Sequence, residues 1–393
     1  MFGNFVSLRV LDCLAVMSCG PYYMIPMLII TPGNPHFGIS IDIRIYYARP
    51  PTRTFGIANS NGKHYIILRS RPAHAAEKNY RVKDAYALVT GATDGIGKAL
   101  VEELAARGWN VIIHGRSTQK LEPLIHRLSD QYPNQHFLPF LADASKSPEE
   151  LKLPELLRQF KGCNITLLIN NVGGLPPVKA LSELTDEEII QNVHVNVSFG
   201  VCLTRVILKE GLLARKSCIL SLGSIGSIMT LPGTPTYSAS KAFTTKFNAC
   251  LREQLASQEP IFRTDDIATK SVEIISIIPG GVRTAMTPID HASYSPFDGR
   301  TFLVTPAAFA RATLGKIGLG QYYREIYSCW RHEFQMGVLT AFPEEWGVRA
   351  WINRLLMKAV DGPRAEGWKR LGAGWKMVDG KLVGPDTGGR KLD

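Results

Sequence analysis

The chain has 393 residues, of which 45% are hydrophobic, and a formal net charge of +11. This length and apolar content are ample for one large core, or for one core with appended segments. The basic residues are scattered and no nucleic-acid-binding motif accompanies them, so attraction to anionic lipid, phosphate-bearing cofactors or CoA thioesters is the simpler interpretation of the charge. The seven cysteines form no Cys-x-x-Cys pair, which indicates a reducing compartment, and no residue cluster has metal-ligand spacing.

Residues 1–83 precede the region in which strands and helices alternate. Their segment 13–30 carries no charged side chain, and at ~1.5 Å per residue it is long enough to cross a bilayer core of ~30 Å as a helix. Pro21 and Pro26 oppose a regular helix, although membrane helices tolerate proline. A membrane anchor and a segment without membrane contact therefore both stay open, as does a misassigned translation start or intron. Alternating isoleucines over 39–45 predict a strand.

A glycine-rich turn, Thr90–Gly97, lies between an apolar run at 85–89, which predicts a buried strand, and a predicted helix that begins at Lys98. Glycines in such a turn let the backbone approach a pyrophosphate, and the N-terminus of the following helix offers free N–H groups to the anion. A phosphate-loop NTPase is excluded, because that motif needs glycine in place of Ala92 and a hydroxyl residue in place of Ala99. The pattern predicts a dinucleotide-binding site, with a tight structural turn as the alternative.

The second predicted strand, 111–113, is followed by Arg116 and Ser117. An NAD-preferring site would place Asp or Glu here to bind the ribose 2′-hydroxyl, and no acidic residue lies between Asn110 and Lys120. Arg116 and Ser117 can instead hold a 2′-phosphate, so we expect NADP(H) rather than NAD(H). The alternative is that Arg116 is an ordinary exposed arginine.

Strands and helices alternate from Ala85 to about Ile278. We predict one nucleotide-binding domain over 84–330, between an N-terminal extension (1–83) and a C-terminal region (331–393). Further strands are predicted at 136–140, 165–170, 217–222 and 271–278, and further helices at 118–131, 148–160, 186–208 and 236–257. This alternation predicts an α/β fold with a doubly wound parallel sheet of the Rossmann type, covered by helices on both faces. Ligands of such sheets bind at the carboxyl ends of the strands.

Tyr237 and Lys241 are four positions apart in a predicted helix and so lie on one helical face. A free phenol titrates near pH ~10, which is too high for ready proton transfer at neutral pH. A cation at ~4 Å and an effective dielectric of ~20 is worth roughly 4 kcal/mol, or about three pKa units. We therefore expect Lys241 to lower the pKa of the Tyr237 phenol and to make it a usable general acid.

Ser224 follows the predicted strand 217–222 and is expected to hydrogen-bond a developing oxyanion, with Ser221 as the competing serine. Reduction of a ketone needs a hydride donor, a proton donor and groups that polarise the carbonyl, and Ser224, Tyr237 and Lys241 supply the last two. A serine hydrolase is set aside, because a nucleophile elbow needs glycine in place of Leu222.

Taken together, these motifs resemble the short-chain dehydrogenase/reductase family over about residues 86–330. The glycine turn looks like the family's cofactor loop, Asn170–Gly173 resembles its Asn-Asn-Ala-Gly element with Val172 in place of alanine, and Ser224 precedes Tyr237 at the family's usual catalytic spacing. Within the family, two features are similar to the very-long-chain 3-oxoacyl-CoA reductase and hydroxysteroid dehydrogenase branch. One is the amino-acid sequence Asp94–Gly97 of the turn, and the other is the segment Thr301–Pro306 followed by Trp330–His332.

The resemblance implies an NADP-dependent oxidoreductase acting on CH–OH groups, namely a carbonyl reductase for an apolar ketone such as a long-chain 3-oxoacyl-CoA or a steroid-like ketone. A reductase of a specialised polyketide or terpenoid pathway is one alternative, and a non-catalytic dinucleotide-binding scaffold protein is the alternative of another class. The catalytic residues that the resemblance implies are Ser224, Tyr237, Lys241 and Asn196. The NADP(H) site that it implies consists of Gly91, Asp94, Gly95, Ile96, Gly97, Arg116, Ser117, Asp143, Asn170, Tyr237, Lys241, Val282 and Thr284.

Three roles in this set carry alternatives or depend on the resemblance. Asp143 is expected to contact the adenine, and Thr284 lies in the segment expected beside the nicotinamide carboxamide. Asn196 is expected to hold a water that connects Lys241 to solvent, although it can instead satisfy a kinked helix. No metal is expected. Residues 282–304 are predicted to form a loop that covers the substrate, with a passive connector as the alternative.

The C-terminal region is predicted to hold an amphipathic helix between Pro343 and Gly362, which either packs on the enzyme body or lies in the plane of a membrane. The last residues, rich in glycine, lysine and aspartate, are predicted to be disordered. We expect the cytosolic face of the endoplasmic reticulum membrane as the location, with the cytoplasm as the alternative. The expected partner is a small apolar ketone or alcohol, with a membrane and a second copy of the chain as open possibilities and no nucleic acid.

Overall fold

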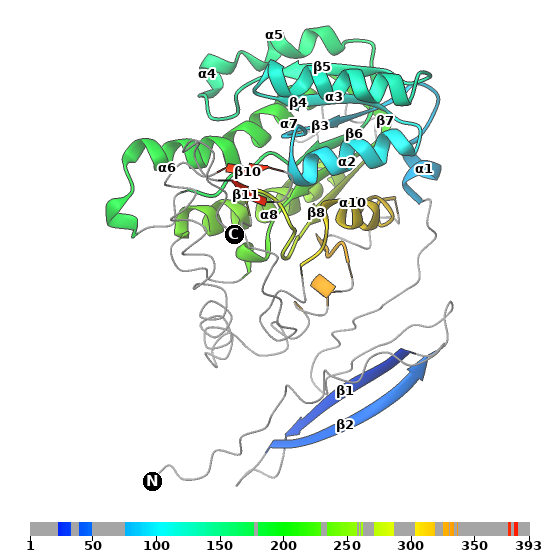
Figure 1. Cartoon of the computed structure of the whole chain (residues 1–393), viewed down its shortest axis with the longest axis vertical. Helices are drawn as coiled ribbons and strands as arrows, with labels where there is room; N and C mark the ends of the chain where they lie inside the picture. Colours follow the sequence, from blue (N-terminus) through cyan, green and yellow to red (C-terminus); the bar gives the residue numbers. More distant parts are fainter. Residues whose placement is uncertain are drawn as a thin grey trace. The chain divides into compact units, whose positions relative to one another are not determined.

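The computed structural model describes residues 23–32, 39–48, 75–176, 180–228, 234–257, 259, 261, 271–286, 303–318, 325–329, 331–333, 336, 376–378 and 381–383. A seven-stranded sheet in the order β5-β4-β3-β6-β7-β8-β9 dominates this part of the chain (Figure 1). Its strands are β3 (Ala85–Val89), β4 (Asn110–Gly115), β5 (Phe137–Leu141), β6 (Asn164–Asn170), β7 (Leu213–Leu222), β8 (Ser271–Ile277) and β9 (Glu325–Ile326). Each pair of neighbouring strands is parallel, which confirms the predicted sheet.

The strand order reverses between β3 and β6. From β3 the chain adds β4 and β5 on one side, and then returns to place β6 and the later strands on the other side. The loops that leave β3 and β6 therefore diverge at the carboxyl ends of these strands, where open α/β sheets bind their ligands. The glycine turn follows β3, and Asn170 ends β6, so both predicted motifs lie at this switch point.

Alternate residues of the central strands enter two different hydrophobic clusters. Ala87 and Val89 of β3 face the cluster formed with α2 (Gly95–Ala106), α3 (Thr118–Gln131) and α10 (Pro306–Leu314), whereas Leu88 faces the other cluster. The second cluster is formed with α5 (Leu153–Leu157), α7 (Phe199–Lys209) and α8 (Pro235–Ala256). The continuous apolar run at 85–89 is thus explained by burial on both faces.

Two predicted helices are interrupted. The predicted helix 148–160 is divided into α4 (Pro148–Leu151), α5 and a 3₁₀ turn at Arg158–Phe160, with Lys152 in the left-handed region at φ 45°. Pro154 has no N–H to continue the hydrogen-bond ladder, so the chain breaks before it. The predicted helix 186–208 consists of α6 (Asp186–Val193), a π-helical turn at His194–Ser198 and α7.

A short helix, α1 (Ala75–Tyr80), precedes the sheet. It belongs to the same unit as the sheet, and this unit begins at Pro72. Ala76 and Tyr80 are buried in the core, and the Tyr80 hydroxyl donates a hydrogen bond to the Glu273 carboxylate of β8. The boundary between the two units therefore lies before α1, whereas the sequence pattern placed it at residue 83. A helix of six residues with two core contacts gives no periodic signal.

The N-terminal unit, residues 1–71, contains an antiparallel pair, β1 (Tyr23–Pro32) and β2 (Ile39–Ala48). The strand predicted from the isoleucine alternation is confirmed. Residues 23–30 lie in β1 and not in a helix, so a helical membrane span over 13–30 is wrong for these residues, and the remainder of that segment lies outside the described residues. Where the structure describes the chain, it contains no helix with the length and hydropathy of a membrane span.

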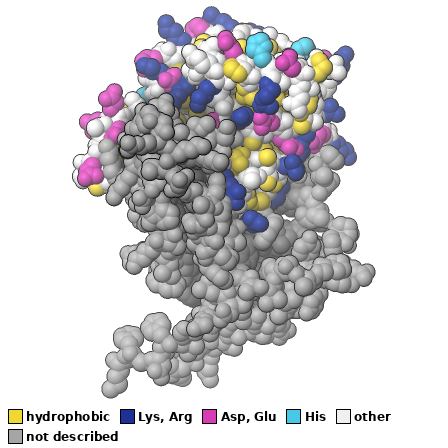
Figure 2. Space-filling view, in the orientation of Figure 1, with side chains coloured by type: hydrophobic (Ala, Val, Ile, Leu, Met, Phe, Trp, Pro, Cys, Tyr) yellow, Lys and Arg dark blue, Asp and Glu magenta, His cyan; other side chains and the backbone are white. Residues whose placement is uncertain are grey.

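The C-terminal region contains a two-stranded antiparallel sheet of β10 (Lys376–Val378) and β11 (Lys381–Val383). We predicted disorder for the last residues, and this pairing corrects that prediction for the two strands. The predicted amphipathic helix between Pro343 and Gly362 lies outside the described residues. Acidic and basic side chains are mixed over the described part of the face drawn in Figure 2, in line with the scattered basic residues of the sequence.

Candidate active site

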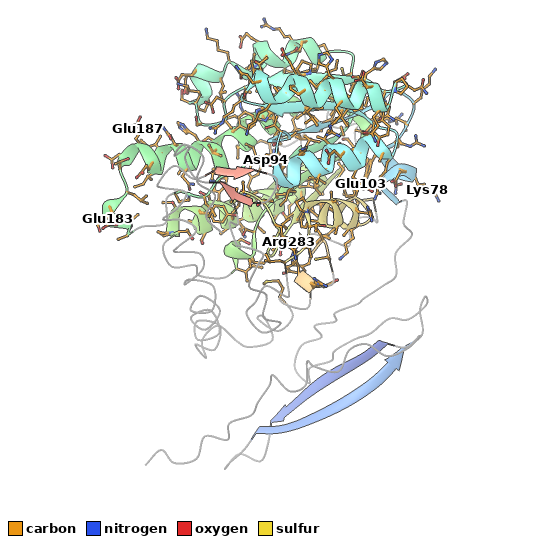
Figure 3. The ribbon with its side chains drawn as sticks, in the orientation of Figure 1. Lys78, Asp94, Glu103, Glu183, Glu187 and Arg283 are labelled. Atoms are coloured by element: carbon orange, nitrogen blue, oxygen red, sulfur yellow. The ribbon has the colours of Figure 1, made fainter. Side chains whose placement is uncertain are left out.

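The glycine turn between β3 and α2 is a tightly closed backbone cradle. Gly91 and Gly95 adopt left-handed conformations, with φ of 60° and 53°, which side chains disfavour. A Cβ on Gly97 would lie 2.1 Å from the Gly91 carbonyl oxygen, so this position accepts no side chain in the present turn. Asp94, labelled at the beginning of α2 in Figure 3, caps the helix by accepting a hydrogen bond from Gly95 N at 2.7 Å. Ile96 packs against the core below the turn.

Two side chains outside the predicted site, those of Asn171 and His114, hydrogen-bond the backbone of this turn. The Asn171 amide donates to the carbonyl oxygens of Thr90 at 2.8 Å and Gly91 at 3.0 Å. His114 Nδ1, at the end of β4, accepts the Gly91 N–H at 2.9 Å. The pair Asn170–Asn171 at the end of β6 was a sequence signal for Asn171. No sequence pattern pointed to His114 on β4.

Asn170, the residue that we assigned to the cofactor, donates through Nδ2 to Thr204 Oγ1 at 3.0 Å. Its Oδ1 is buried and has no hydrogen-bond partner in the described structure. A buried polar oxygen without a partner is costly, so this atom is available to a bound molecule or to water at the end of β6.

Arg116 and Ser117 follow β4, where Arg116 is exposed and Ser117 is the N-cap residue of α3. Asp143 follows β5 and accepts hydrogen bonds from Ser145 N at 3.0 Å and Ser145 Oγ at 2.8 Å. Burial raises the pKa of Asp143, but these bonds and the nearby Arg116 together hold it below its usual value. Arg116 and Asp143 thus lie in the loops that follow two adjacent strands, β4 and β5.

The segment after β8 lies against the glycine turn. Val282 is buried and forms a parallel bridge with Val304, and the Thr284 methyl lies 3.2 Å from the place that a Cβ on Gly95 would take. His332 holds the start of this segment, since its Nδ1 accepts the Gly280 N–H at 3.1 Å. Of the two predicted cofactor residues in this segment, Thr284 thus lies against the turn, whereas Val282 belongs to the hydrophobic core.

Tyr237 and Lys241 lie on one face of α8, as predicted, and both are buried. Lys241 Nζ lies 5.8 Å from the centroid of the Tyr237 ring and donates a hydrogen bond to the Leu222 carbonyl at 3.0 Å. The ammonium is therefore over the ring face and bound to the end of β7. Burial lowers the pKa of Lys241 to about 8.

We expected Lys241 to lower the pKa of the Tyr237 phenol, and for the protein without a bound ligand this prediction is wrong. Burial raises the pKa of the Tyr237 phenol, and the effect that opposes it is a hydrogen bond with Ser224. The physical reason is that desolvation penalises the phenolate, while the Lys241 ammonium is directed at a backbone carbonyl. The phenol is consequently fully protonated at neutral pH.

Ser224, and not Ser221, meets the tyrosine. Ser224 Oγ accepts the Gly226 N–H at 3.0 Å and hydrogen-bonds Tyr237. Ser221 Oγ donates instead to Asn248 Oδ1 at 3.2 Å, within a buried structural network. The geometry therefore resolves the competition between the two serines that the sequence left open.

Asn196 lies in the π-helical turn between α6 and α7 and is buried. Its amide donates to the Gly174 and Asn192 carbonyls at 2.8 and 3.0 Å, so it does satisfy the distorted helix. It also approaches the lysine, because a Cβ on Gly173 would lie 2.9 Å from Asn196 Oδ1 and 3.0 Å from Lys241 Nζ. Both predicted roles of this residue are thus geometrically open.

A small cavity of about 30 Å³ has a lining of apolar side chains and five polar residues, Asn170, Asn196, Ser221, Lys241 and Thr244. One water molecule needs at least ~10–15 Å³ of such space and two to four polar partners, so the cavity can hold one. A larger cavity of about 440 Å³ opens beside Ser145 and α6, away from Tyr237. Residues 287–302, the centre of the predicted substrate-covering loop, lie outside the described residues.

The parallel sheet, the glycine turn at its switch point and the tyrosine–lysine pair on α8 define the class of Rossmann-type dinucleotide-binding proteins. The family model for short chain dehydrogenases matches residues 85–293, and the chain belongs to this family. It is therefore an oxidoreductase of a family that uses a nicotinamide dinucleotide.

Several relatives are about 30% identical to this chain over the residues that align. The very-long-chain 3-oxoacyl-CoA reductase of Neurospora crassa is 30% identical over 256 residues, which cover 64% of this chain and 71% of the relative. The protein of the same name from Anas platyrhynchos is 29% identical over 289 residues, or 73% of this chain and 83% of the relative. The human protein named inactive hydroxysteroid dehydrogenase-like protein 1 is 30% identical over 279 residues, or 70% and 77%.

Solved structures agree on the fold. A 7beta-hydroxysteroid dehydrogenase covers 70% of this chain and 98% of its own, with a TM-score of 0.55 and 20% identity. A short-chain dehydrogenase from Sphingobium yanoikuyae in complex with NADPH covers 68% and 95%, with a TM-score of 0.51 and 20% identity. These identities support the architecture alone, so substrate and cofactor preference depend on this chain's own residues.

Proposed function

We propose that this protein is an NADPH-dependent carbonyl reductase, able to run in reverse as an alcohol dehydrogenase, which acts on an apolar ketone. The observation that carries the proposal is the convergence of Ser224, Tyr237 and Lys241 at the carboxyl end of β7. Long-chain 3-oxoacyl-CoA is the substrate class that we favour, because relatives at about 30% identity carry that name. Steroid-like ketones and specialised polyketide or terpenoid ketones are the alternatives.

The residues present fit a dinucleotide. Gly91, Gly95 and Gly97 leave a cradle at the N-terminus of α2 that a Cβ would fill or strain, and a helix N-terminus favours a pyrophosphate. Arg116 and Ser117 would hold the adenosine 2′-phosphate, while Asp143 would contact the adenine. Asp94, Ile96, Asn170, Val282 and Thr284 complete the predicted site around the turn. When bound, the cofactor supplies the hydride.

The protein's own groups supply the proton. Ser224 Oγ would donate a hydrogen bond to the ketone oxygen, and the Tyr237 hydroxyl would donate its proton to the same oxygen as the carbon is reduced. A phenol whose pKa is raised by burial remains fully protonated at neutral pH, and the developing alkoxide is more basic than a phenolate, so the transfer is still favourable. The product is the alcohol, with one new C–H bond and one new O–H bond.

Lys241 and Asn196 would return the proton to Tyr237. The ammonium of Lys241 and the amide of Asn196 both border the small cavity, which has room for one water. A water there would link Lys241 to the polar groups at the end of β6, including the unpartnered Oδ1 of Asn170. The structural role of Asn196 in the π-helical turn fixes its position for this link.

A screen of NADPH oxidation tests the function. Long-chain 3-oxoacyl-CoA esters, steroid ketones and polyketide ketones would be offered to the purified chain, with cofactor binding measured separately by calorimetry. We expect turnover of at least one apolar ketone class and the highest kcat/KM with the long-chain thioesters. Tight NADPH binding without turnover of any ketone would favour the second candidate, a non-catalytic dinucleotide-binding protein, which the human relative named inactive brings into consideration.

The preference for NADPH is tested at Arg116. Replacing it in Arg116→Ala removes the guanidinium that would bind the 2′-phosphate, and a hydrogen bond to a charged group contributes ~1.5–3 kcal/mol. We expect the Kd for NADPH to rise roughly 10- to 100-fold, with little change for NADH. The matched control is Arg127→Ala, an exposed arginine on α3 that pairs with Glu102 at 2.6 Å. Equal affinity of the wild type for both cofactors would refute the assignment.

The proposed location is the cytosolic face of the endoplasmic reticulum membrane, with the cytoplasm as the alternative. It is supported by the long acyl chain of the favoured substrate, which partitions into lipid, and by the formal net charge of +11. Separation of membrane and soluble fractions of cells that express the full chain distinguishes the two.

A further inference from the structure

His114 is a buried histidine whose backbone and side chain both bind the glycine turn. It is 2% exposed and lies next to the last residue of β4. Its ring packs between two aromatic rings, with centroid distances of 5.0 Å to Phe140 and 4.8 Å to Phe199. Its Nδ1 accepts the Gly91 N–H at 2.9 Å, and its carbonyl oxygen accepts the Ala92 N–H at 2.8 Å.

Both backbone polar groups of Gly91 are thereby hydrogen-bonded. Its N–H is bound by His114 and its carbonyl oxygen by the Asn171 amide at 3.0 Å. Gly91 has φ 60°, and its carbonyl is the atom that Gly97 approaches most closely. A shift of this peptide would therefore alter the space between the turn and the N-terminus of α2, where the pyrophosphate would lie.

The ring must be neutral to act in this way, because only an unprotonated Nδ1 can accept a hydrogen bond. Burial lowers the pKa of His114 to about 4, against smaller opposite effects of the Ala142 backbone and the Asp143 carboxylate. Nε2 of the ring is buried and has no hydrogen-bond partner in the described structure, so the hydrogen bond that Nδ1 accepts from Gly91 is the ring's contact with the turn.

We propose that His114 is a positioning residue for the dinucleotide, which holds the Gly91 peptide in the conformation that binds the pyrophosphate. The inference rests on the proposed dinucleotide site and adds to it a residue that contacts the turn but not the cofactor. An apolar side chain at this position would bury an unpaired Gly91 N–H, and the turn would lose the preorganisation that binding requires.

Two substitutions separate positioning from packing. His114→Phe keeps a ring between Phe140 and Phe199 but removes the acceptor. His114→Asn keeps an acceptor oxygen but removes the ring, and so should lose more stability against urea. By calorimetry we expect the Kd for NADPH to rise about tenfold in His114→Phe, equal to ~1.4 kcal/mol, and to stay within about threefold of wild type in His114→Asn.

A purely structural role predicts the opposite order, because NADPH binding would then follow stability and His114→Asn would bind worse. That order, or unchanged NADPH binding in His114→Phe, would overturn the inference while leaving the proposed function intact. A wild-type chain that binds no NADPH would overturn both. A measurement without any variant is amide exchange in the cofactor-free wild type, where slow exchange of the Gly91 N–H is expected and exchange at the rate of an open loop would contradict the inference.

Discussion

Tyr237→Phe is expected to retain NADPH binding, because the rest of the cofactor site is unchanged, and to lose nearly all reductase activity. The substitution removes the hydroxyl that hydrogen-bonds Ser224 and keeps the buried ring beneath Lys241. General acid catalysis contributes typically ~10²–10⁴-fold, so the single-turnover rate of ketone reduction should fall by about 10³-fold. The measurement is the loss of reduced-nicotinamide absorbance after a ketone is mixed with the NADPH-bound protein.

The control is Tyr132→Phe, which removes the hydroxyl of a tyrosine that follows α3 and whose partner is the exposed Gln131. Its rate should match the wild type. Unchanged cofactor affinity in Tyr237→Phe separates a chemical defect from a misfolded site. If Tyr237→Phe reduced the ketone at the wild-type rate, another group would have to donate the proton, and the proposed roles of Ser224, Tyr237 and Lys241 would fail together.

Gly97→Ala is expected to abolish dinucleotide binding in a chain that still folds. The new Cβ would lie 2.1 Å from the Gly91 carbonyl oxygen and 2.5 Å from the Asn171 amide nitrogen. The carbonyl is backbone and the amide is held by its own hydrogen bonds, so the turn must open. Alanine is otherwise favoured over glycine in a helix by roughly 0.5–1 kcal/mol. The Kd for NADPH by calorimetry should rise by at least about 100-fold, or ~2.7 kcal/mol.

Gly162→Ala provides the contrast. Gly162 has φ 99° and no atom within 4 Å of a Cβ, and it precedes β6 at the amino end of the sheet. Its substitution strains the backbone without entering the site, so stability against urea should fall while NADPH binding is retained. Retained NADPH binding in Gly97→Ala would show that the turn is only structural, which is the alternative that the sequence left open.

The sequence predicted the sheet and the order of its strands and helices well, because burial on both faces produces continuous apolar runs such as 85–89 and 111–113. The break at Lys152 has a signal in the sequence, Pro154, which the prediction of a helix over 148–160 did not take into account. The π-helical turn around Asn196 has no such signal, since it depends on how a helix meets its neighbours. The family resemblance predicted that Ser224 acts with Tyr237 and Lys241, and in the structure Ser224 hydrogen-bonds Tyr237 while Lys241 lies over the tyrosine ring; their catalytic roles stay predictions.

The expected lowering of the Tyr237 pKa failed because a spacing of four residues determines which helical face two side chains share. It does not determine the distance between their charged or polar atoms. Lys241 reaches the Leu222 carbonyl, and the phenol of Tyr237 is buried, so desolvation determines the direction of its pKa. No sequence pattern indicated His114, for a related reason. Its partner is a backbone N–H of the turn more than twenty residues away, and hydrogen bonds to backbone leave no pairing pattern in a sequence.

The pH dependence of kcat for ketone reduction tests the central claim most directly, because every turnover after the first needs Lys241 to return a proton to Tyr237. The pKa of Lys241 is lowered to about 8 by burial, so its ammonium is present below that pH and lost above it. With Tyr237 protonated throughout this range, the account predicts a constant rate below about pH 8 and a fall of about tenfold per pH unit above it. A rate that remains constant to about pH 10, or one that rises with pH, would contradict the proposal that Lys241 and Tyr237 deliver the proton.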